Sequence, residues 1–142
     1  MIKGVLITEL DVITTPGGNV LHAMKEDDAG YEGFGEAYFS QIDKDVIKAW
    51  KRHKRMTLNL VVPVGEIKFL LFDDRDMSNT RFQEITISRS NYCRLTVPPM
   101  IWMGFQGLSN DGSMLLNIAN ILHDPDEVDR KELSEIKYDW SN

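Results

Sequence analysis

The sequence has almost no cysteine, no long apolar run and no excess of positive charge. Cys93 is the only cysteine among 142 residues, which excludes an internal disulfide and a zinc site built from thiolates. No apolar run approaches the roughly 20 residues that span a bilayer. We therefore expect a cytoplasmic protein that has no membrane partner and lies in a reducing compartment.

The charge balance is acidic. Sixteen lysines and arginines against 22 aspartates and glutamates give a net charge of −6. A general nucleic-acid binder needs a positive field that attracts phosphates and displaces counterions, so nucleic acid is not an expected partner. The hydrophobic fraction of 42% and the length are typical of one globular domain, which we expect to cover residues 1–142.

Helical periodicity is scarcely present before residue 124, and short extended segments separated by turns take its place. Strands at intervals of about ten residues favour an antiparallel sandwich or closed barrel over a parallel α/β sheet. Pro63, Gly65, Pro98 and Gly112 mark turns between them. The expected strands cover residues 4–10, 34–41, 46–52, 57–62, 66–73, 82–87, 93–97, 101–107 and 114–121.

Three segments fall outside these strands. Thr15–Asn19, with the sequence Thr-Pro-Gly-Gly-Asn, should stop the first strand, because proline removes a donor and glycine allows positive φ. Residues 23–33 are polar and irregular. The charged tail from Asp124 to Glu135, with Pro125 near its start, predicts a short surface helix or loop rather than another strand.

A basic run, Lys51-Arg52-His53-Lys54-Arg55, stands out against the acidic background. If it continues as a strand, alternation places Lys51, His53 and Arg55 on one face, with Arg52 and Lys54 on the other. Burying like charges is costly unless they are neutralised, so an inward-facing set indicates an anionic ligand such as a diphosphate, or internal ion pairs. The alternative is a solvated strand end that pairs with acidic side chains.

The histidines do not form a metal site. Several imidazoles and a carboxylate would have to converge, and His53 stands alone while His22 and His123 have no partner at ligand spacing. We treat His22 and His123 as structural or exposed. Gly33 and Gly35 lead into a predicted strand rather than a helix, so a Rossmann-type nucleotide site is not expected. We predict no metal and no cofactor.

Some polar and aromatic residues have two interpretations. Tyr38 and Trp102 could stack on a base or a sugar ring, or pack in the core. Asn117 and Asn120 interrupt the apolar stretch 114–121, where an unsatisfied buried amide costs about 1–3 kcal/mol, so each must be paired or functional. Alternation puts them on opposite faces, so at most one of them lines a cavity in a regular strand.

Four short motifs appear in an order that resembles the dTDP-4-dehydrorhamnose 3,5-epimerase family of the cupin superfamily. They are Gly65-Glu66-Ile67, Phe72–Arg75, Leu95–Phe105 and Asp124–Glu127. The resemblance runs from about residue 34 to residue 140. It implies an all-β jelly-roll barrel (a double-stranded β-helix) with a short C-terminal helical or loop segment. It also implies a homodimer that acts in deoxysugar or surface polysaccharide biosynthesis.

The family's reaction removes a proton next to the carbonyl of a nucleotide-linked 4-keto-6-deoxy sugar. By position, the resemblance assigns His53 as the catalytic base. Lys51, Lys54 and Arg55 would disfavour an additional positive charge on its ring and so keep it neutral. The residues expected to bind the substrate are Lys51, Lys54, Arg55, Asn59, Trp102, Asn117, Asn120 and Tyr38.

The sequence departs from the family pattern at other positions. The enolate-stabilising lysine is Leu58 here, and the tyrosine that acts as acid is Asn117. Met103 and Phe69 replace a histidine and a carboxylate, and the aspartate that orients the histidine has no counterpart. Three functions stay open: an isomerase with reduced machinery, a non-catalytic module that binds a nucleotide sugar or another anion, and a structural partner in a sugar pathway.

Overall fold

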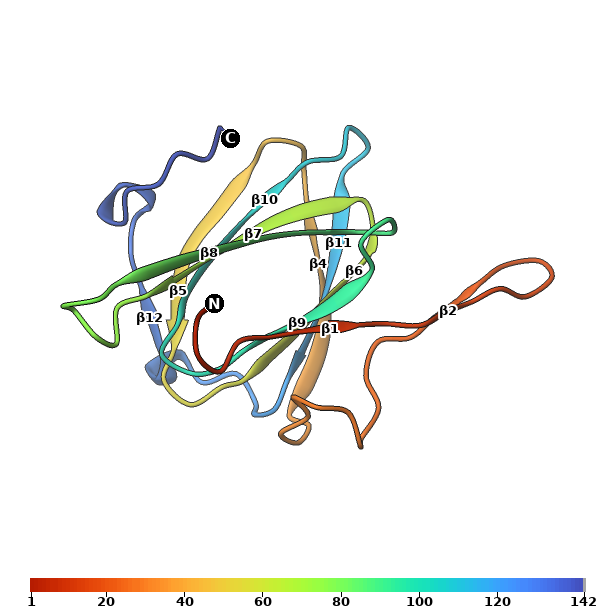
Figure 1. Cartoon of the computed structure of the whole chain (residues 1–142), viewed down its shortest axis with the longest axis horizontal. Coiled ribbons are helices and arrows are strands. Elements are labelled where there is room, and N and C mark those ends of the chain that lie inside the picture. Colours follow the sequence, from red (N-terminus) through yellow and green to blue (C-terminus); the bar gives the residue numbers. More distant parts are fainter. Residues whose placement is uncertain (142) are drawn as a thin grey trace.

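The computed structural model describes residues 1–141, which form two five-stranded antiparallel sheets and a small hairpin (Figure 1). The first sheet has the order β1 (Leu6–Glu9), β9 (Cys93–Val97), β6 (Leu58–Val64), β11 (Ser113–Ala119), β4 (Glu36–Ile42). The second has the order β12 (Val128–Arg130), β5 (Ile47–His53), β10 (Trp102–Gly107), β7 (Glu66–Asp73), β8 (Arg81–Ser88). The two sheets face each other as a jelly-roll barrel, which confirms the predicted fold class.

The hydrophobic core fills the part of the barrel between β6, β7 and β9. Most residues of these strands are buried, because both faces of the strands are covered. Leu60, Phe69, Leu71 and Leu95 are fully buried in one cluster. Apolar side chains fill this part of the barrel. The cavity lies in the other part, between β4 and β11 of the first sheet and β5 and β10 of the second.

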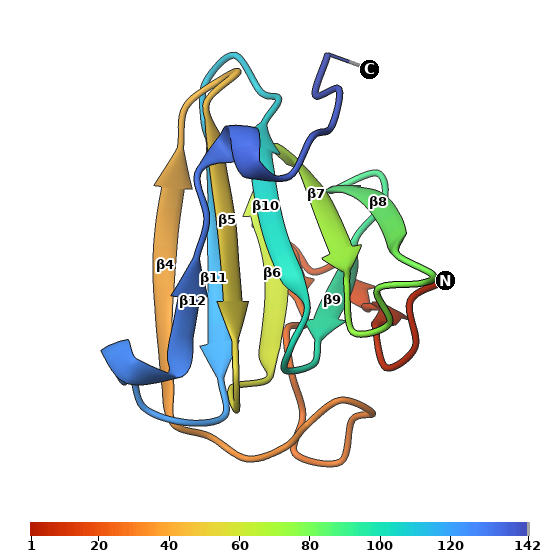
Figure 2. The ribbon, with the colours of Figure 1, turned by 90° about the vertical axis from the view of Figure 1, so that its left-hand side faces the viewer.

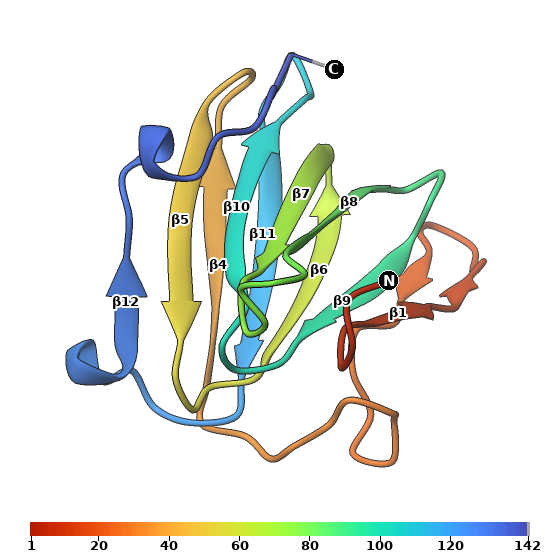
Figure 3. The ribbon, with the colours of Figure 1, turned by 60° about the vertical axis from the view of Figure 1, so that its left-hand side comes forward.

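The C-terminal segment covers the outer face of the second sheet (Figures 2 and 3). Ile136 and Trp140 pack against Trp50 of β5 and Trp102 of β10. Gly104 of β10 allows this approach, because a Cβ there would lie 3.2 Å from the Trp140 ring and 2.6 Å from the Ala49 Cβ. The apolar residues near the end of the chain therefore hold the charged tail against the barrel.

All nine predicted strands are present, within a few residues at their ends. The tail differs from the prediction in one respect. It has short 3-10 turns at Pro125–Glu127 and Leu133–Glu135, but Val128–Arg130 forms the strand β12. β12 pairs with the free edge of β5, and this pairing rather than local composition makes it a strand (Figure 3). No helix in residues 1–141 is long and apolar enough to cross a membrane.

The N-terminal region holds a feature that the sequence did not predict. Thr15–Asn19 forms the turn of a hairpin between β2 (Val12–Ile13) and β3 (Val20–Leu21). The hairpin projects away from the barrel (Figure 1). Residues 23–33 contain no strand, as expected.

The core makes a stability prediction. Leu60→Ala should lower the free energy of unfolding by about 2–5 kcal/mol, because it leaves a cavity among well-packed neighbours. Leu60 is 0% exposed, whereas Leu122 is 70% exposed, so Leu122→Ala is the matched control and should change stability by less than about 0.5 kcal/mol. Urea unfolding followed by circular dichroism measures both. Equal effects of the two substitutions would contradict this placement of the core.

Candidate active site

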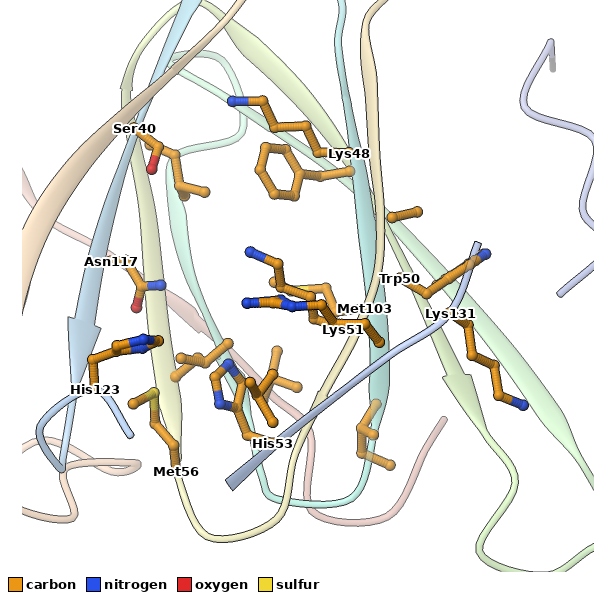
Figure 4. A pocket seen from close by; sticks show the side chains of 18 of the residues that line it. Ser40, Lys48, Trp50, Lys51, His53, Met56, Met103, Asn117, His123 and Lys131 are labelled. Carbon is orange, nitrogen blue, oxygen red and sulfur yellow. The ribbon is translucent and has the colours of Figure 1, made fainter. Parts of the chain in front are cut away.

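A cavity of about 630 Å³ opens between the two sheets at the end that the core leaves free (Figure 4). Tyr38 and Ser40 of β4 and Asn117 of β11 line one wall. Lys51 and His53 of β5 line the opposite wall, together with Met103 and Phe105 of β10. Further lining comes from apolar residues at the base of the cavity, among them Met56, Leu58 and Ile101, and from the loop after β11 and β12 with the segment that follows it.

The basic run divides between the inside and the outside of the barrel. Lys51 and His53 point into the cavity (Figure 4), as strand alternation predicts. Arg52 points outward, where it pairs with Asp129 at 2.9 Å and with Asp74 at 3.3 Å. β5 ends at His53, so the alternation does not extend further along the run.

Lys54 and Arg55 therefore lie outside the cavity, in contrast to their predicted role in substrate binding. The Lys54 ammonium lies 3.7 Å from Asp129, and the Arg55 guanidinium lies 3.1 Å from Asp124. The Arg55 side chain is 61% exposed, and the Lys54 side chain is 50% exposed. For these two residues the alternative interpretation, a solvated strand end with acidic partners, fits the structure.

Glu127 holds the His53 ring in place. One carboxylate oxygen, Oε1, contacts His53 Nδ1, and the other accepts the backbone N–H groups of Arg55 at 3.0 Å and Met56 at 3.2 Å. Burial alone would raise the pKa of Glu127, but the hydrogen bonds from His53, Arg55 and Met56 outweigh it and lower that pKa. An ionised Glu127 makes Nδ1 the donor, which leaves Nε2 with the lone pair that a base needs.

This contact corrects the expected environment of the base. The sequence led us to expect that Lys51, Lys54 and Arg55 would keep the ring neutral by repulsion. The structure instead places a carboxylate against His53 and turns Lys54 and Arg55 away. A carboxylate fixes the tautomer and stabilises the positive charge that develops as the ring takes up a proton. Glu127 thus takes the orienting role for which the sequence showed no counterpart.

The cavity lining has more cations than carboxylates, with Lys48, Lys51, Arg130 and Lys131 against Glu132 and Glu135. Arg130 of β12 lies opposite Lys51 of β5 in the strand register, and both line the cavity. Desolvation, followed by the charges of Arg130 and Lys48, lowers the pKa of Lys51. Neither Lys51 nor Arg130 forms an ion pair with a carboxylate of residues 1–141. Such a group of like charges favours a bound anion.

The opposite wall offers an unused acceptor. Asn117 Nδ2 donates to the Tyr38 hydroxyl at 2.9 Å, while Asn117 Oδ1 is buried and has no hydrogen-bond partner in the described part of the chain. A buried acceptor without a donor is costly, so this amide is a strained feature of the wall. Leu58, at the position of the family's lysine, also lines the cavity and supplies only apolar surface.

Asn59, Trp102 and Asn120 were predicted to bind the substrate, but they lie outside the cavity lining. Asn59 accepts from Thr96 Oγ1 at 2.6 Å and donates to the Gly30 carbonyl. Asn120 accepts the backbone N–H of Thr57 at 2.7 Å. These contacts give both side chains a structural role. Of Asn117 and Asn120, only Asn117 faces the cavity, which agrees with the expectation that at most one of them does.

Trp102 is part of the outer cluster. Its ring is buried beneath Arg52, and the guanidinium carbon lies 4.5 Å from the ring centroid. Its Nε1–H donates to Asp74 at 3.0 Å. Trp102 therefore lies on the outer face of the second sheet, beneath the Arg52 side chain. Its ring does not line the cavity, so it cannot stack on a ligand there.

Sequence reasoning missed several residues of the site. They are Ser40, Lys48, His123, Glu127, Arg130 and Lys131. Most of them lie in or near the charged tail, for which the sequence predicts only a short surface helix or loop. The motif Asp124–Glu127 was the available signal, but it carried no role for Glu127. Among residues 1–141, no three His, Cys, Asp or Glu side chains group so that they could hold a metal ion.

Comparisons with known proteins agree with this fold. A dTDP-sugar isomerase of Desulfovibrio desulfuricans is 35% identical, with a TM-score of 0.92 over 98% of this chain and 92% of that one. A probable low-salt glycan biosynthesis epimerase of Haloferax volcanii is 28% identical over 93% of this chain and 87% of its own length. The sugar 3,4-ketoisomerase of Thermoanaerobacterium thermosaccharolyticum, solved with TDP, shares the fold at 19% identity, with a TM-score of 0.78 over 92% of this chain and 90% of that one. No protein-family model matches the chain.

The two facing antiparallel sheets with a cavity between them place the chain among the cupin-type jelly-roll barrels. Within that class, the chain belongs to the family of dTDP-sugar isomerases and dTDP-4-dehydrorhamnose 3,5-epimerases.

Glu127→Gln tests the contact that orients His53. We expect it to lower the free energy of unfolding at pH 7 by roughly 1–3 kcal/mol, because charge-assisted hydrogen bonds are lost in a buried site. The pKa of Glu127 is lowered in the folded state, so its contribution is complete above the usual value of 4.5 and is lost as the pH falls through the lower pKa of the folded state. The difference between the two proteins should therefore begin to shrink as the pH falls below 4.5.

Urea unfolding at several pH values measures this difference. Glu26→Gln, at an exposed position in the loop after β3, is the matched control and should show no such dependence. A constant difference between Glu127→Gln and the unsubstituted protein at every pH would contradict the assignment.

Proposed function

We propose that the protein is an epimerase or isomerase that acts on a dTDP-linked 4-keto-6-deoxy sugar in deoxysugar or surface polysaccharide biosynthesis. The observation that carries this proposal is the His53 imidazole inside a cationic cavity, with Nδ1 held by Glu127. The dTDP-sugar isomerase and the glycan biosynthesis epimerase, whose folds or sequences match nearly the whole chain, support it.

The reaction begins with removal of a proton from a carbon next to the keto group. The carbonyl acidifies that proton, and His53 Nε2 takes it while the electron pair moves onto the carbonyl oxygen as an enolate. Glu127 stabilises the imidazolium that results. The family's lysine is Leu58 here. Lys51 and Arg130, which lie on the same wall as His53, therefore stabilise the negative charge of the enolate.

The same cations suit the rest of the ligand. A nucleotide sugar carries a diphosphate, and Lys48, Lys51 and Arg130 present three positive charges along one side of the cavity. Across from them, the Asn117 amide and the Tyr38 ring form the polar part of the opposite wall. Lys51 thus lies where the diphosphate and the enolate could both use its charge.

A binding module without catalysis would need the same cations but not an oriented imidazole. Two backbone N–H groups hold the buried carboxylate of Glu127. This carboxylate contacts His53 Nδ1, and the lone pair that takes up a proton is on the other ring nitrogen, Nε2. This arrangement favours the enzyme, because it prepares one nitrogen to take up a proton. The homodimer and the cytoplasmic location stay predictions.

His53→Asn should abolish proton removal while it leaves ligand binding intact. With dTDP-4-keto-6-deoxyglucose in heavy water, the unsubstituted protein should incorporate deuterium next to the keto group, and the variant should lose at least about 100-fold of that rate. Nuclear magnetic resonance follows the exchange, and calorimetry with TDP checks binding. His22→Asn, which removes an imidazole outside the cavity, is the matched control. Undiminished exchange in His53→Asn would refute the role of this base.

Lys51→Ala should weaken TDP binding by roughly 10- to 100-fold, since a hydrogen bond to a charged group contributes about 1.5–3 kcal/mol. Lys54→Ala removes the same charge three residues along, from an exposed side chain outside the cavity, and should change the Kd by less than about threefold. Isothermal titration calorimetry at two salt concentrations compares them. Similar losses in both variants would indicate a diffuse field rather than a bound diphosphate.

A further inference from the structure

The two walls of the cavity carry imidazoles from different parts of the chain. His53 reaches the cavity from the end of β5, and His123 reaches it from the loop that follows β11. In Figure 4 the His123 ring points into the cavity from the side of Asn117, and the His53 ring lies on the side of Lys51. A sugar ring bound between the walls would therefore present one face to each histidine.

Inversion at a carbon next to a keto group needs proton transfer on both faces. A base removes the proton from one face, and an acid returns a proton from the other. His53 serves one face. At the position of the family's acid this chain has Asn117, whose amide cannot deliver a proton at neutral pH. The acid must therefore come from another residue of the same wall.

Tyr38 and His123 are the two side chains of that wall that could act as acids. The Tyr38 oxygen accepts a hydrogen bond from Asn117, and burial together with the charge of Glu36 raises the pKa of Tyr38, which makes it a weaker acid. His123 is exposed at the cavity mouth, where water can restore a proton that it gives up. Imidazole is also the side chain that exchanges protons most readily near neutral pH.

We propose that His123 is a catalytic residue, the acid that returns a proton to the enolate from the face opposite His53. In this step, a proton moves from His123 to the carbon, the enolate electron pair forms the new C–H bond, and the carbonyl is restored. His53 has gained one proton and His123 has lost one, and exchange with water returns both to their starting states. This inference rests on the proposed function and adds the second proton carrier to it.

The test separates enolate formation from the return of the proton. His123→Asn and His123→Gln are incubated with dTDP-4-keto-6-deoxyglucose in heavy water, beside Tyr38→Phe, His53→Asn and the control His22→Asn. Nuclear magnetic resonance measures deuterium in recovered substrate and the rate of product formation. TDP affinity and thermal unfolding show whether each variant folds and binds.

We expect both His123 variants to bind TDP normally and to incorporate deuterium into recovered substrate, because His53 still forms the enolate and can return a solvent deuteron to the same face. Product formation should fall by at least about 100-fold, the lower end of what a positioned acid contributes. His53→Asn should instead lose both exchange and product. A purely structural role of His123 would not produce this separation.

Product formation within about threefold of the unsubstituted protein in both His123 variants would overturn the inference. The same separation in Tyr38→Phe instead would also overturn it and would make Tyr38 the acid. Absence of exchange in the unsubstituted protein would count against the proposed function itself. Exchange in the unsubstituted protein with unchanged turnover in the His123 variants would refute the role of His123 alone.

Discussion

The carboxylate of Glu127 ties together parts of the chain that are distant in sequence. It accepts hydrogen bonds from the backbone at Arg55 and Met56, where the chain leaves β5, and it contacts the ring of His53. Because Glu127 closes the turn just before β12, the same contacts hold the tail against the edge of β5. The contact with the carboxylate fixes the tautomer of the ring, and the pairing of β12 with β5 brings Arg130 beside Lys51.

The cavity is open because its lining cannot collapse on itself. The core end of the barrel is filled by interlocking apolar side chains such as Leu60, Phe69 and Leu95. At the other end, Lys51 and Arg130 repel each other, and Asn117 keeps an acceptor without a donor. Packing these groups together in the absence of a ligand would desolvate charge without compensation. One barrel thus combines a stable half with a half that favours an anionic ligand.

The basic run shows how a tertiary boundary decides the use of a sequence motif. Alternation along β5 correctly placed Lys51 and His53 inside and Arg52 outside. It failed at Arg55, because the strand ends at His53 and the chain turns toward β6. The position of a strand end depends on hydrogen bonds to neighbouring strands, and the run of like residue types carries no mark of it. Lys54 and Arg55 therefore pair with acidic residues of the tail instead of a ligand.

The sequence by itself determined the strands and the barrel, and it singled out His53 as the predicted base. Alternating and continuous apolar runs, broken by proline and glycine, are local signals, and the motif order around Gly65-Glu66 located His53. Only the tertiary structure decided which groups surround that base. Glu127 and Arg130 come from a charged segment that locally resembles any solvated tail, and they reach the site because β12 pairs with β5 across more than 70 residues of chain. His123 reaches the site from the loop that follows β11. Side chains that meet through such long-range pairing leave no periodic pattern in the sequence.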